Sequence, residues 1–273
     1  MRFPIPVVNV EPELELENLE LSQAKQILAA QLNIQIHAHA QNALSFADLL
    51  ESKQCAAVLG EFQTRIQAVN LTCSGSMFMK YWAVPLLFPY LYALLTEQVR
   101  LSWELSALSV EMAPTWDWDR HLNFKPSFLS ARSLSTQNQS YGTVILSIFD
   151  DLNQVFEVIS KVAKVQRFLL WENTALRILQ FYDMMQRKNP TQTGLRKIQQ
   201  QRQFLSNLAA EYFDLKQNPF LLLEQSRNSK GGSYQRKKCC FYFQLPEAEN
   251  EYCSSCPLAK KNQQREQNSC QIN

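Results

Sequence analysis

The sequence predicts an α+β fold that is predominantly α-helical, with a small antiparallel sheet and a C-terminal cysteine-rich segment. Apolar residues recur at helical spacing over most of the chain, one stretch alternates with the period of a strand, and four cysteines lie close together near the end. The 273 residues, of which 46% are hydrophobic, are enough to bury a core in one large domain or two small ones.

The N-terminal part of the chain favours two helices. The first is expected over residues 17–32, where apolar residues recur at the spacing of one helix face. A shorter helix is expected over residues 45–52, because Ser45 is a good N-cap and Asp48 follows it three residues later.

The most apolar part, residues 76–96, predicts a helical region that contains Pro85 and Pro89. Its continuous apolar run, residues 81–95, is shorter than the roughly 20 residues that a membrane-spanning helix needs. We therefore expect a buried helix broken by proline and no transmembrane segment. A surface that touches a membrane peripherally is the alternative.

Two short strands are expected next. Apolar and polar residues alternate over residues 99–105, as in a half-buried strand. Residues 116–128 are rich in aromatic and polar residues and predict a second short strand or a loop. The polar stretch 130–142 is the best internal boundary.

The second half of the chain is expected to be helical. Apolar stripes predict helices over residues 145–162, 168–182 and 195–212. Asn-Pro pairs at 189–190 and 218–219 end the second and third of these helices.

These elements suggest three regions. Residues 1–140 form an N-terminal α+β region and residues 141–225 a helical region. Residues 226–273 contain a linker and the cysteine-rich segment, because residues 226–233 are rich in Gly, Ser and Lys.

The composition excludes several classes of protein. A formal charge of +2 gives no indication of nucleic-acid binding, and the N-terminus lacks the apolar core of a signal peptide. The seven cysteines, an odd number, argue against a disulfide framework. We therefore expect a cytoplasmic protein whose clustered cysteines bind metal or do redox work.

The cysteine cluster is the most informative feature of the sequence. Cys239, Cys240, Cys253 and Cys256 lie within eighteen residues, whereas Cys55, Cys73 and Cys270 are scattered. Four thiolates suit a tetrahedral zinc ion or a [2Fe–2S] cluster. The second pair has the spacing of a zinc site, but two adjacent cysteines do not easily reach one ion. Spacing favours iron–sulfur, while zinc and unmetallated redox thiols remain open.

The same residues resemble a known family. The run CCFYFQLP from Cys239 to Pro246, followed by Cys253-Ser-Ser-Cys256-Pro-Leu, is similar to the C-terminal signature of siderophore–iron reductases of the ferrioxamine B reductase type. Upstream, Leu-Trp-Glu-Asn at residues 170–173 resembles the family's Leu-Trp-x-Asn motif. Twelve residues separate Cys240 from Cys253, two more than the family commonly has, which predicts a longer loop beside the cysteines.

The resemblance implies a function. The four cysteines would hold a [2Fe–2S] cluster, and the protein would be a ferric-siderophore reductase that adds one electron to siderophore-bound Fe(III) and releases Fe(II) in the cytoplasm. Reduction is a release step because hard oxygen donors hold Fe(II) less tightly. The six glycines form no dinucleotide-binding motif, so the electrons are expected from a separate ferredoxin or flavoprotein.

Other polar residues are candidates for a role at the site. Basic residues bracket the cysteines and are possible partner or substrate contacts, with an ordinary solvated face as the alternative: Arg236, Lys237, Lys238, Lys260 and Lys261. Asn173 is expected to cap or to hydrogen-bond to the cysteine segment, and Trp171 to lie in the core.

For two other histidine-containing patterns, a structural role is favoured over a functional one. His37 and His39 are interpreted as surface or core residues, with a remote metal site as the alternative. The group Asp117, Asp119 and His121 is interpreted as part of a turn, with a wall of the substrate pocket as the alternative. The main rival function is a non-enzymatic binding module stabilised by zinc on the four cysteines. A siderophore-assembly enzyme is a second rival, but it requires an ATP-binding motif that the sequence lacks.

Overall fold

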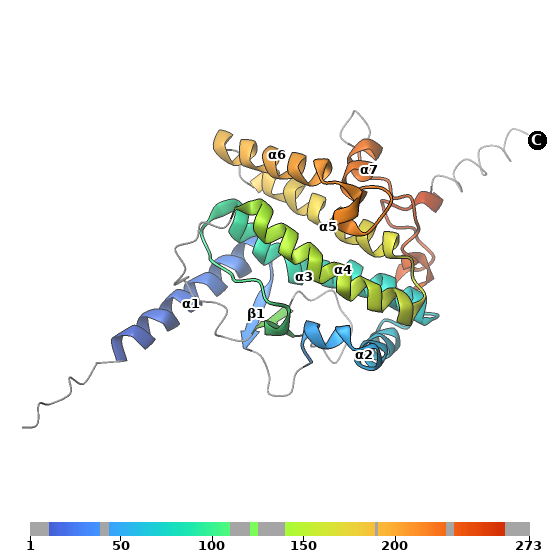
Figure 1. Ribbon diagram of the computed structural model, residues 1–273, viewed down its shortest axis with the longest axis horizontal. Coiled ribbons are helices and arrows are strands. Elements are labelled where there is room, and N and C mark those ends of the chain that lie inside the picture. The colour runs from blue at the N-terminus through green and yellow to red at the C-terminus, as the bar shows by residue number, and fades with distance from the viewer. Residues whose placement is uncertain are drawn as a thin grey trace, which may run out of the picture.

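The protein is described by a computed structural model that places α-helices around one long central helix (Figure 1). It describes residues 11–38, 44–109, 121–124, 140–188, 191–227 and 232–259, and gives only the backbone for residues 11–20, 38 and 121–124. The predominantly helical fold that the sequence predicts is confirmed.

The central helix is α3 (Leu71–Thr96), which makes most of its helix contacts with three other helices. These are α2 (Ser52–Arg65), α4 (Tyr141–Ala163) and α5 (Arg167–Lys188). In Figure 1, α4 and α5 run beside α3. Because α3 is enclosed by neighbours, apolar residues all round its surface can be buried.

The expectation that proline breaks this helix is wrong. Pro85 and Pro89 both lie inside α3, which is continuous from Leu71 to Thr96. A proline within a helix removes one backbone hydrogen bond and costs about 3 kcal/mol, and burial along the whole length of α3 offsets that cost. By length and composition α3 is the one described helix that qualifies for crossing a membrane, but 72% of its qualifying window is buried within the protein.

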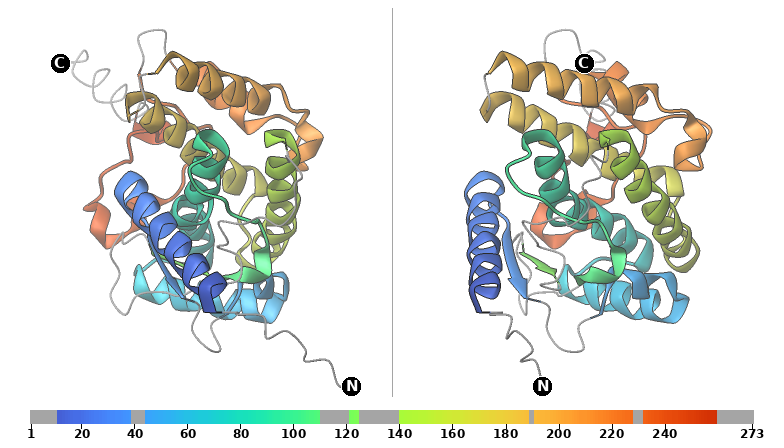
Figure 2. Two further views of the ribbon diagram at one scale, coloured as in Figure 1. Left: turned by 90° about the vertical axis from the view of Figure 1, so that its left-hand side faces the viewer. Right: turned by 60° about the vertical axis from the view of Figure 1, so that its left-hand side comes forward.

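The remaining helices cover the flanks of this core. A layer formed by α6 (Gln192–Asn207) and α7 (Pro219–Ser226) lies on α5. The first helix, α1 (Glu11–Leu32), lies beside the strand β1 (Gln35–Ala38) at one edge of the molecule (Figure 2). The division of the chain into three regions stays a prediction.

The predicted antiparallel sheet is not confirmed. Three short strands pair in the order β1–β3–β2, with β1 parallel to β3 (His121–Phe124) and β2 (Leu108–Ser109) antiparallel to it. Residues 99–104 form no strand, and a 3-10 helix, η2 (Leu105–Ala107), follows them.

The alternation that predicted the strand over residues 99–105 is nevertheless visible as burial. Val99 and Leu105 are buried, whereas Arg100 and Glu104 are exposed. A side chain, and not a neighbouring strand, bonds to its backbone: the Tyr90 hydroxyl donates a hydrogen bond to the Ser102 carbonyl. Within 116–128 the structure describes only β3, and within 130–142 only residues 140–142.

Local signals predicted one helix boundary correctly and missed two others. Ser45 and Asp48 form the expected capping box, at the start of the 3-10 helix η1 (Phe46–Leu50). The helix over 195–212 is shorter than expected, because α6 ends at Asn207 and the 3-10 helix η4 (Ala210–Phe213) follows. The prediction that Asn218 ends this helix is wrong, because its side chain caps the first turn of the next helix, α7.

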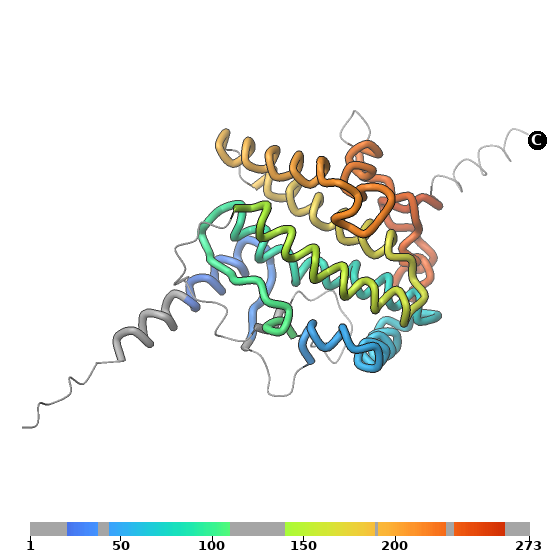
Figure 3. The backbone as a smooth tube through the Cα atoms, viewed as in Figure 1, coloured from blue at the N-terminus to red at the C-terminus, as the bar shows by residue number. Residues whose placement is uncertain are grey.

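The segment that follows α7 packs against the N-terminal halves of α3 and α5 (Figure 3). It contains two short 3-10 helices, η5 (Tyr242–Gln244) and η6 (Pro246–Ala248), and little other regular structure. All four clustered cysteines lie in it.

Candidate metal centre

The fold of the C-terminal segment brings the four cysteine sulfurs together in two pairs. Cys240 Sγ lies 3.8 Å from Cys253 Sγ, and Cys239 Sγ lies 3.9 Å from Cys256 Sγ. The chain turns directly after the adjacent cysteines, where Phe241 adopts a left-handed conformation with φ of 67°. A turn from Cys253 to Cys256, closed by a backbone hydrogen bond of 2.9 Å, places these two cysteines opposite Cys239 and Cys240.

These distances fit two metal ions. With metal–sulfur bonds of about 2.3 Å, two thiolates on one tetrahedral ion lie about 3.8 Å apart. Each pair of sulfurs has that spacing, and each pair joins one of the adjacent cysteines to one of the later two. Across the ranges described, no group of three or more His, Cys, Asp or Glu side chains is placed to hold one metal ion. The donor set therefore fits a two-iron centre better than one zinc ion.

A buried guanidinium lies against one pair of sulfurs. Arg236 is 2% exposed, and its Nη2 donates to Cys240 Sγ at 2.8 Å and to Cys253 Sγ at 2.7 Å. A buried cation requires an anion beside it, and thiolate sulfur supplies one here. This arrangement favours negative charge on the sulfur pair, and the thiolate is the form that binds metal.

A second buried cation approaches the same sulfur from α3. Lys80 Nζ lies 3.6 Å from Cys240 Sγ and 4.2 Å from the centre of the Tyr242 ring. Burial lowers the pKa of the Lys80 ammonium, and the sulfurs of Cys240 and Cys253 oppose that effect by favouring its charge.

The surroundings select Cys240 as the more acidic thiol of its pair. A hydrogen bond from Cys253 lowers the pKa of Cys240 well below its ordinary value. The positive charges of Arg236 and Lys80 act in the same direction, while burial opposes them. Burial raises the pKa of Cys239, which has no such cation in hydrogen-bond contact within the part of the chain that is described.

Comparison with known families decides what this segment is. Residues 236–258, from Arg236 to just beyond the last cysteine of the cluster, match the family model of the FhuF 2Fe-2S C-terminal domain. The segment is a FhuF-type 2Fe-2S domain. Its cofactor is a [2Fe–2S] cluster, which sets aside the zinc-stabilised alternative. Among curated proteins, none matches the chain.

The FhuF-type domain is anchored on α5 by two adjacent polar residues. The buried Glu172 carboxylate accepts hydrogen bonds from the backbone N–H groups of Lys237 at 2.6 Å and Lys238 at 3.0 Å. Asn173 Oδ1 accepts from Arg236 Nη1 at 2.6 Å. The expectation that Asn173 hydrogen-bonds to the cysteine segment is confirmed.

The domain is also anchored on α3. Ser76 Oγ donates to the carbonyl of Cys240 at 3.1 Å, and Asn173 Nδ2 donates to the carbonyl and the hydroxyl of Ser76. Ser76 therefore links α3, α5 and the cysteine segment. Cys73, one turn earlier, lies near the carbonyl of Phe241, with Sγ and oxygen 3.7 Å apart.

A charged network holds the chain just before the domain. Arg202 on α6 donates to Asp183 at 2.7 Å, to Glu224 at 2.7 Å and to the hydroxyl of Tyr234 at 2.8 Å. These contacts fix Tyr234 two residues before Arg236, so the domain enters the site from a defined position.

The remaining residues singled out in the sequence fall in three groups. Lys237 and Lys238 are exposed, whereas Arg236 is buried against the sulfurs and does not share their solvated face. Cys55 is a core residue, and Trp171 is fully buried, as expected. Outside the described residues lie Lys260, Lys261, Cys270, His39, Asp117 and Asp119; His37 is exposed on β1, and only the backbone of His121 is described.

Sequence reasoning missed Lys80, Glu172 and Arg177. Lys80 carried a usable signal, because it is the one charged residue in the apolar sequence of α3. A lone charge within a buried helix requires a partner and therefore indicates a site. Glu172 and Arg177 gave no comparable signal, since α5 contains several charged residues.

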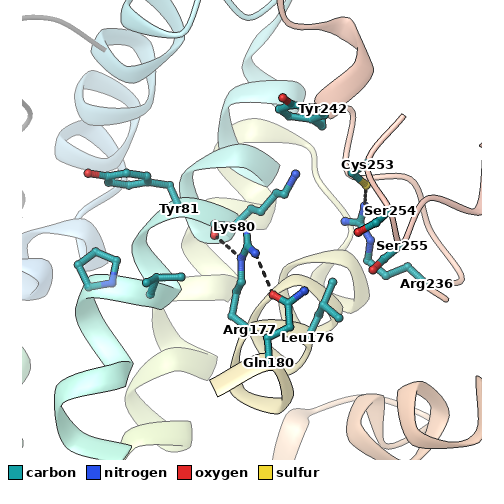
Figure 4. Close-up of a pocket in the computed structure, with 12 residues that line it drawn as sticks. Lys80, Tyr81, Leu176, Arg177, Gln180, Arg236, Tyr242, Cys253, Ser254 and Ser255 are labelled. Atoms are coloured by element: carbon teal, nitrogen blue, oxygen red, sulfur yellow. Dashed lines mark hydrogen bonds between the residues drawn. The ribbon is translucent and has the colours of Figure 1, made fainter. Parts of the chain in front are cut away.

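A cavity of about 380 Å³ opens beside the FhuF-type domain (Figure 4). It is lined by α3, α5 and the cysteine segment, with Lys80, Arg177, Arg236 and Cys253 in its wall. In Figure 4 the Lys80 side chain extends toward Tyr242. The cavity therefore places space for a small molecule against Cys253, one of the four clustered cysteines.

Proposed function

We propose that the protein is a ferric-siderophore reductase that works in the cytoplasm. It would deliver one electron to Fe(III) held by a siderophore, and the resulting Fe(II) would leave its oxygen donors. The observation that carries this proposal is the cavity beside a FhuF-type 2Fe-2S domain, with Cys253 in its wall.

We assign Cys239, Cys240, Cys253 and Cys256 as the ligands of the cluster. The two sulfur pairs support this assignment, as do the cations that face Cys240 and Cys253. When bound, the [2Fe–2S] cluster supplies a one-electron donor and acceptor.

The residues around the sulfurs have separate tasks in this proposal. Arg236 places positive charge and two hydrogen bonds on the sulfurs of Cys240 and Cys253, which favours the reduced form of the centre. Lys80 adds a second positive charge from the cavity side. Glu172 and Asn173 hold the segment so that these contacts persist.

The electrons would come from a separate protein, a ferredoxin or a flavoprotein reductase. The exposed Lys237 and Lys238 would meet an acidic surface on that donor. The electrons balance, because the donor loses one electron and Fe(III) gains one. The transfer itself moves no proton and needs no covalent bond to the substrate.

The test is stoichiometric reduction of a ferric chelate. The protein with its cluster is reduced with dithionite, freed of excess reductant under anaerobic conditions, and mixed with a ferric hydroxamate and an Fe(II)-trapping dye. We expect about one Fe(II) per chain as the cluster absorbance returns to its oxidised form. A reduced protein that keeps its electron in the presence of the chelate overturns the proposal. NADPH with no donor protein should give no Fe(II).

A further inference from the structure

We infer that the cavity between α3 and α5 binds a Fe(III) chelate with anionic oxygen donors, and that Lys80 and Arg177 contact those oxygens. The inference rests on the proposed function and adds to it a binding site and a charge preference. Chelates that carry net negative charge bind more tightly there than matched chelates with a positive charge.

The size and the walls of the cavity suit such a ligand. Its volume of about 380 Å³ lies within the range of roughly 300–1,000 Å³ typical of small-molecule sites. Val84, Pro85 and Leu176 supply an apolar wall, against which the carbon skeleton of a chelator packs. Ser254 at the cavity is exposed, so a ligand larger than the cavity can extend into solvent.

The described side chains that line the cavity carry net positive charge. Lys80, Arg177 and Arg236 line it, and no acidic side chain is among the described residues that do so. The oxidised cluster is itself anionic, because its thiolates and sulfides outnumber the positive charges of its irons. An anionic chelate beside it is repelled unless cations lie between or around them, and these three side chains supply that compensation.

Two hydrogen bonds hold Arg177 beside Lys80. Its Nε donates to the carbonyl of Lys80 at 3.2 Å, and its Nη1 donates to Gln180 Oε1 at 2.9 Å (Figure 4). The first bond reaches the turn of α3 that precedes Pro85 and fixes Arg177 beside Lys80. The pair forms a two-point contact for oxygen atoms on one ligand.

The same position gives a short path for the electron. Lys80 Nζ lies 3.6 Å from Cys240 Sγ, and Cys253 lines the cavity directly. A chelate whose oxygens contact Lys80 is therefore separated from the cluster sulfurs by little more than one side-chain group. In the transfer the reduced cluster loses one electron and Fe(III) becomes Fe(II).

The binding test uses two gallium(III) chelates with the same coordination core. Ga(III) has the charge of Fe(III) but is not reduced, so binding is measured without turnover. One chelate is gallium desferrioxamine B, whose pendant amine is cationic; the other is its N-succinyl derivative, whose pendant group is a carboxylate. Calorimetric titration of the oxidised protein should give about tenfold tighter binding for the anionic chelate at low salt.

Variants of one helix locate the contact. Arg177→Gln should abolish most of the tenfold difference, whereas Arg177→Lys, which keeps the charge, should retain part of it. Arg187→Gln is the matched control, because Arg187 is exposed on α5 and lies about 15 Å further along the helix. The visible spectrum of each variant verifies that the cluster is retained.

A chromium(III) chelate tests the distance to the cluster. Its unpaired electrons should accelerate relaxation of the electron paramagnetic resonance signal of the reduced cluster, and Arg177→Gln should weaken that effect. Equal affinity for the two gallium chelates, or no chromium effect in a protein that still reduces the ferric chelate, overturns this site while the proposed function stands. A protein that neither binds nor reduces any of the chelates contradicts both.

Discussion

Arg236 Nη1 donates a hydrogen bond of 2.6 Å to Asn173 Oδ1, and this bond joins the cysteine segment to α5. Because the bond fixes the guanidinium, its other terminal nitrogen faces the sulfurs of Cys240 and Cys253. The positive charge at the centre is therefore positioned by a residue that does not touch the sulfurs.

Cluster content should depend on the four clustered cysteines and not on the others. Replacement of any one of Cys239, Cys240, Cys253 and Cys256 by Ser is expected to lower iron and acid-labile sulfide strongly, because each sulfur belongs to one of the two pairs. Cys55→Ala and Cys73→Ala are the controls and should keep the full content. Loss of the cluster in Cys73→Ala, or its retention in Cys240→Ser, contradicts the assignment.

Removing the charge of Arg236 should make the cluster harder to reduce. Arg236→Gln takes a positive charge and two hydrogen bonds from sulfurs that become more electron-rich on reduction. We expect the potential to fall by on the order of 60 mV, a tenfold change in a one-electron equilibrium. A dye-linked titration followed in the visible spectrum measures it. Lys237→Gln, at an exposed neighbour, should change the potential much less.

Glu172 should control how firmly the segment holds its metal. In Glu172→Gln one amide oxygen replaces two carboxylate oxygens, so one of the N–H groups of Lys237 and Lys238 loses its acceptor. We expect the cluster absorbance to bleach several-fold faster in a strong chelator. Glu157→Gln, at a half-buried residue of α4 that pairs with Lys161 and Arg167, is the control and should bleach like the unchanged protein.

The exposed lysines beside the cluster should affect the encounter with the electron donor. Reversal of both Lys237 and Lys238 to Glu is expected to slow reduction by an acidic donor protein, most at low salt, while the cluster stays bound. Stopped-flow rates at two ionic strengths measure the effect. The matched control reverses Arg187 and Lys188, exposed at the far end of α5. Equal rates in the two double variants would return these lysines to an ordinary solvated face.

Two glycines in the helices should respond to alanine in opposite directions. A Cβ at Gly75 would lie 2.8 Å from Cβ of Ala163, so Gly75→Ala forces α3 and α4 apart and should destabilise the protein by about 1–3 kcal/mol. Gly60 on α2 has nothing within 4 Å of such a Cβ, so Gly60→Ala should stabilise it by about 0.5–1 kcal/mol. Denaturant unfolding measures both, and equal signs would contradict the α3–α4 packing.

The sequence predicted what depends on local pattern and on short spacing. The helical periodicity of α4 and α5, the capping box at Ser45 and the cysteine pairs could all be read from neighbouring residues. The continuity of α3 could not, because the burial that offsets two prolines comes from helices distant in the sequence.

The cavity was equally out of reach for sequence reasoning. Its wall combines Lys80 of α3 and Arg177 of α5 with Cys253, three residues separated by long stretches of chain. The mixed sheet was missed for the same reason, since β1 pairs with a strand more than eighty residues later. Lys80, a single charge in an apolar run, carried a signal that the sequence analysis did not use.

The bond from Ser76 to the carbonyl of Cys240 spans 164 residues of chain. Contacts of such long range form late in folding, since the intervening loop must close before they contribute. During synthesis α3 leaves the ribosome well before the cysteine segment, so the helices can assemble first and present a finished surface to the last part of the chain. Iron and sulfide would then be inserted at the close of maturation, into a protein whose helical body is already folded.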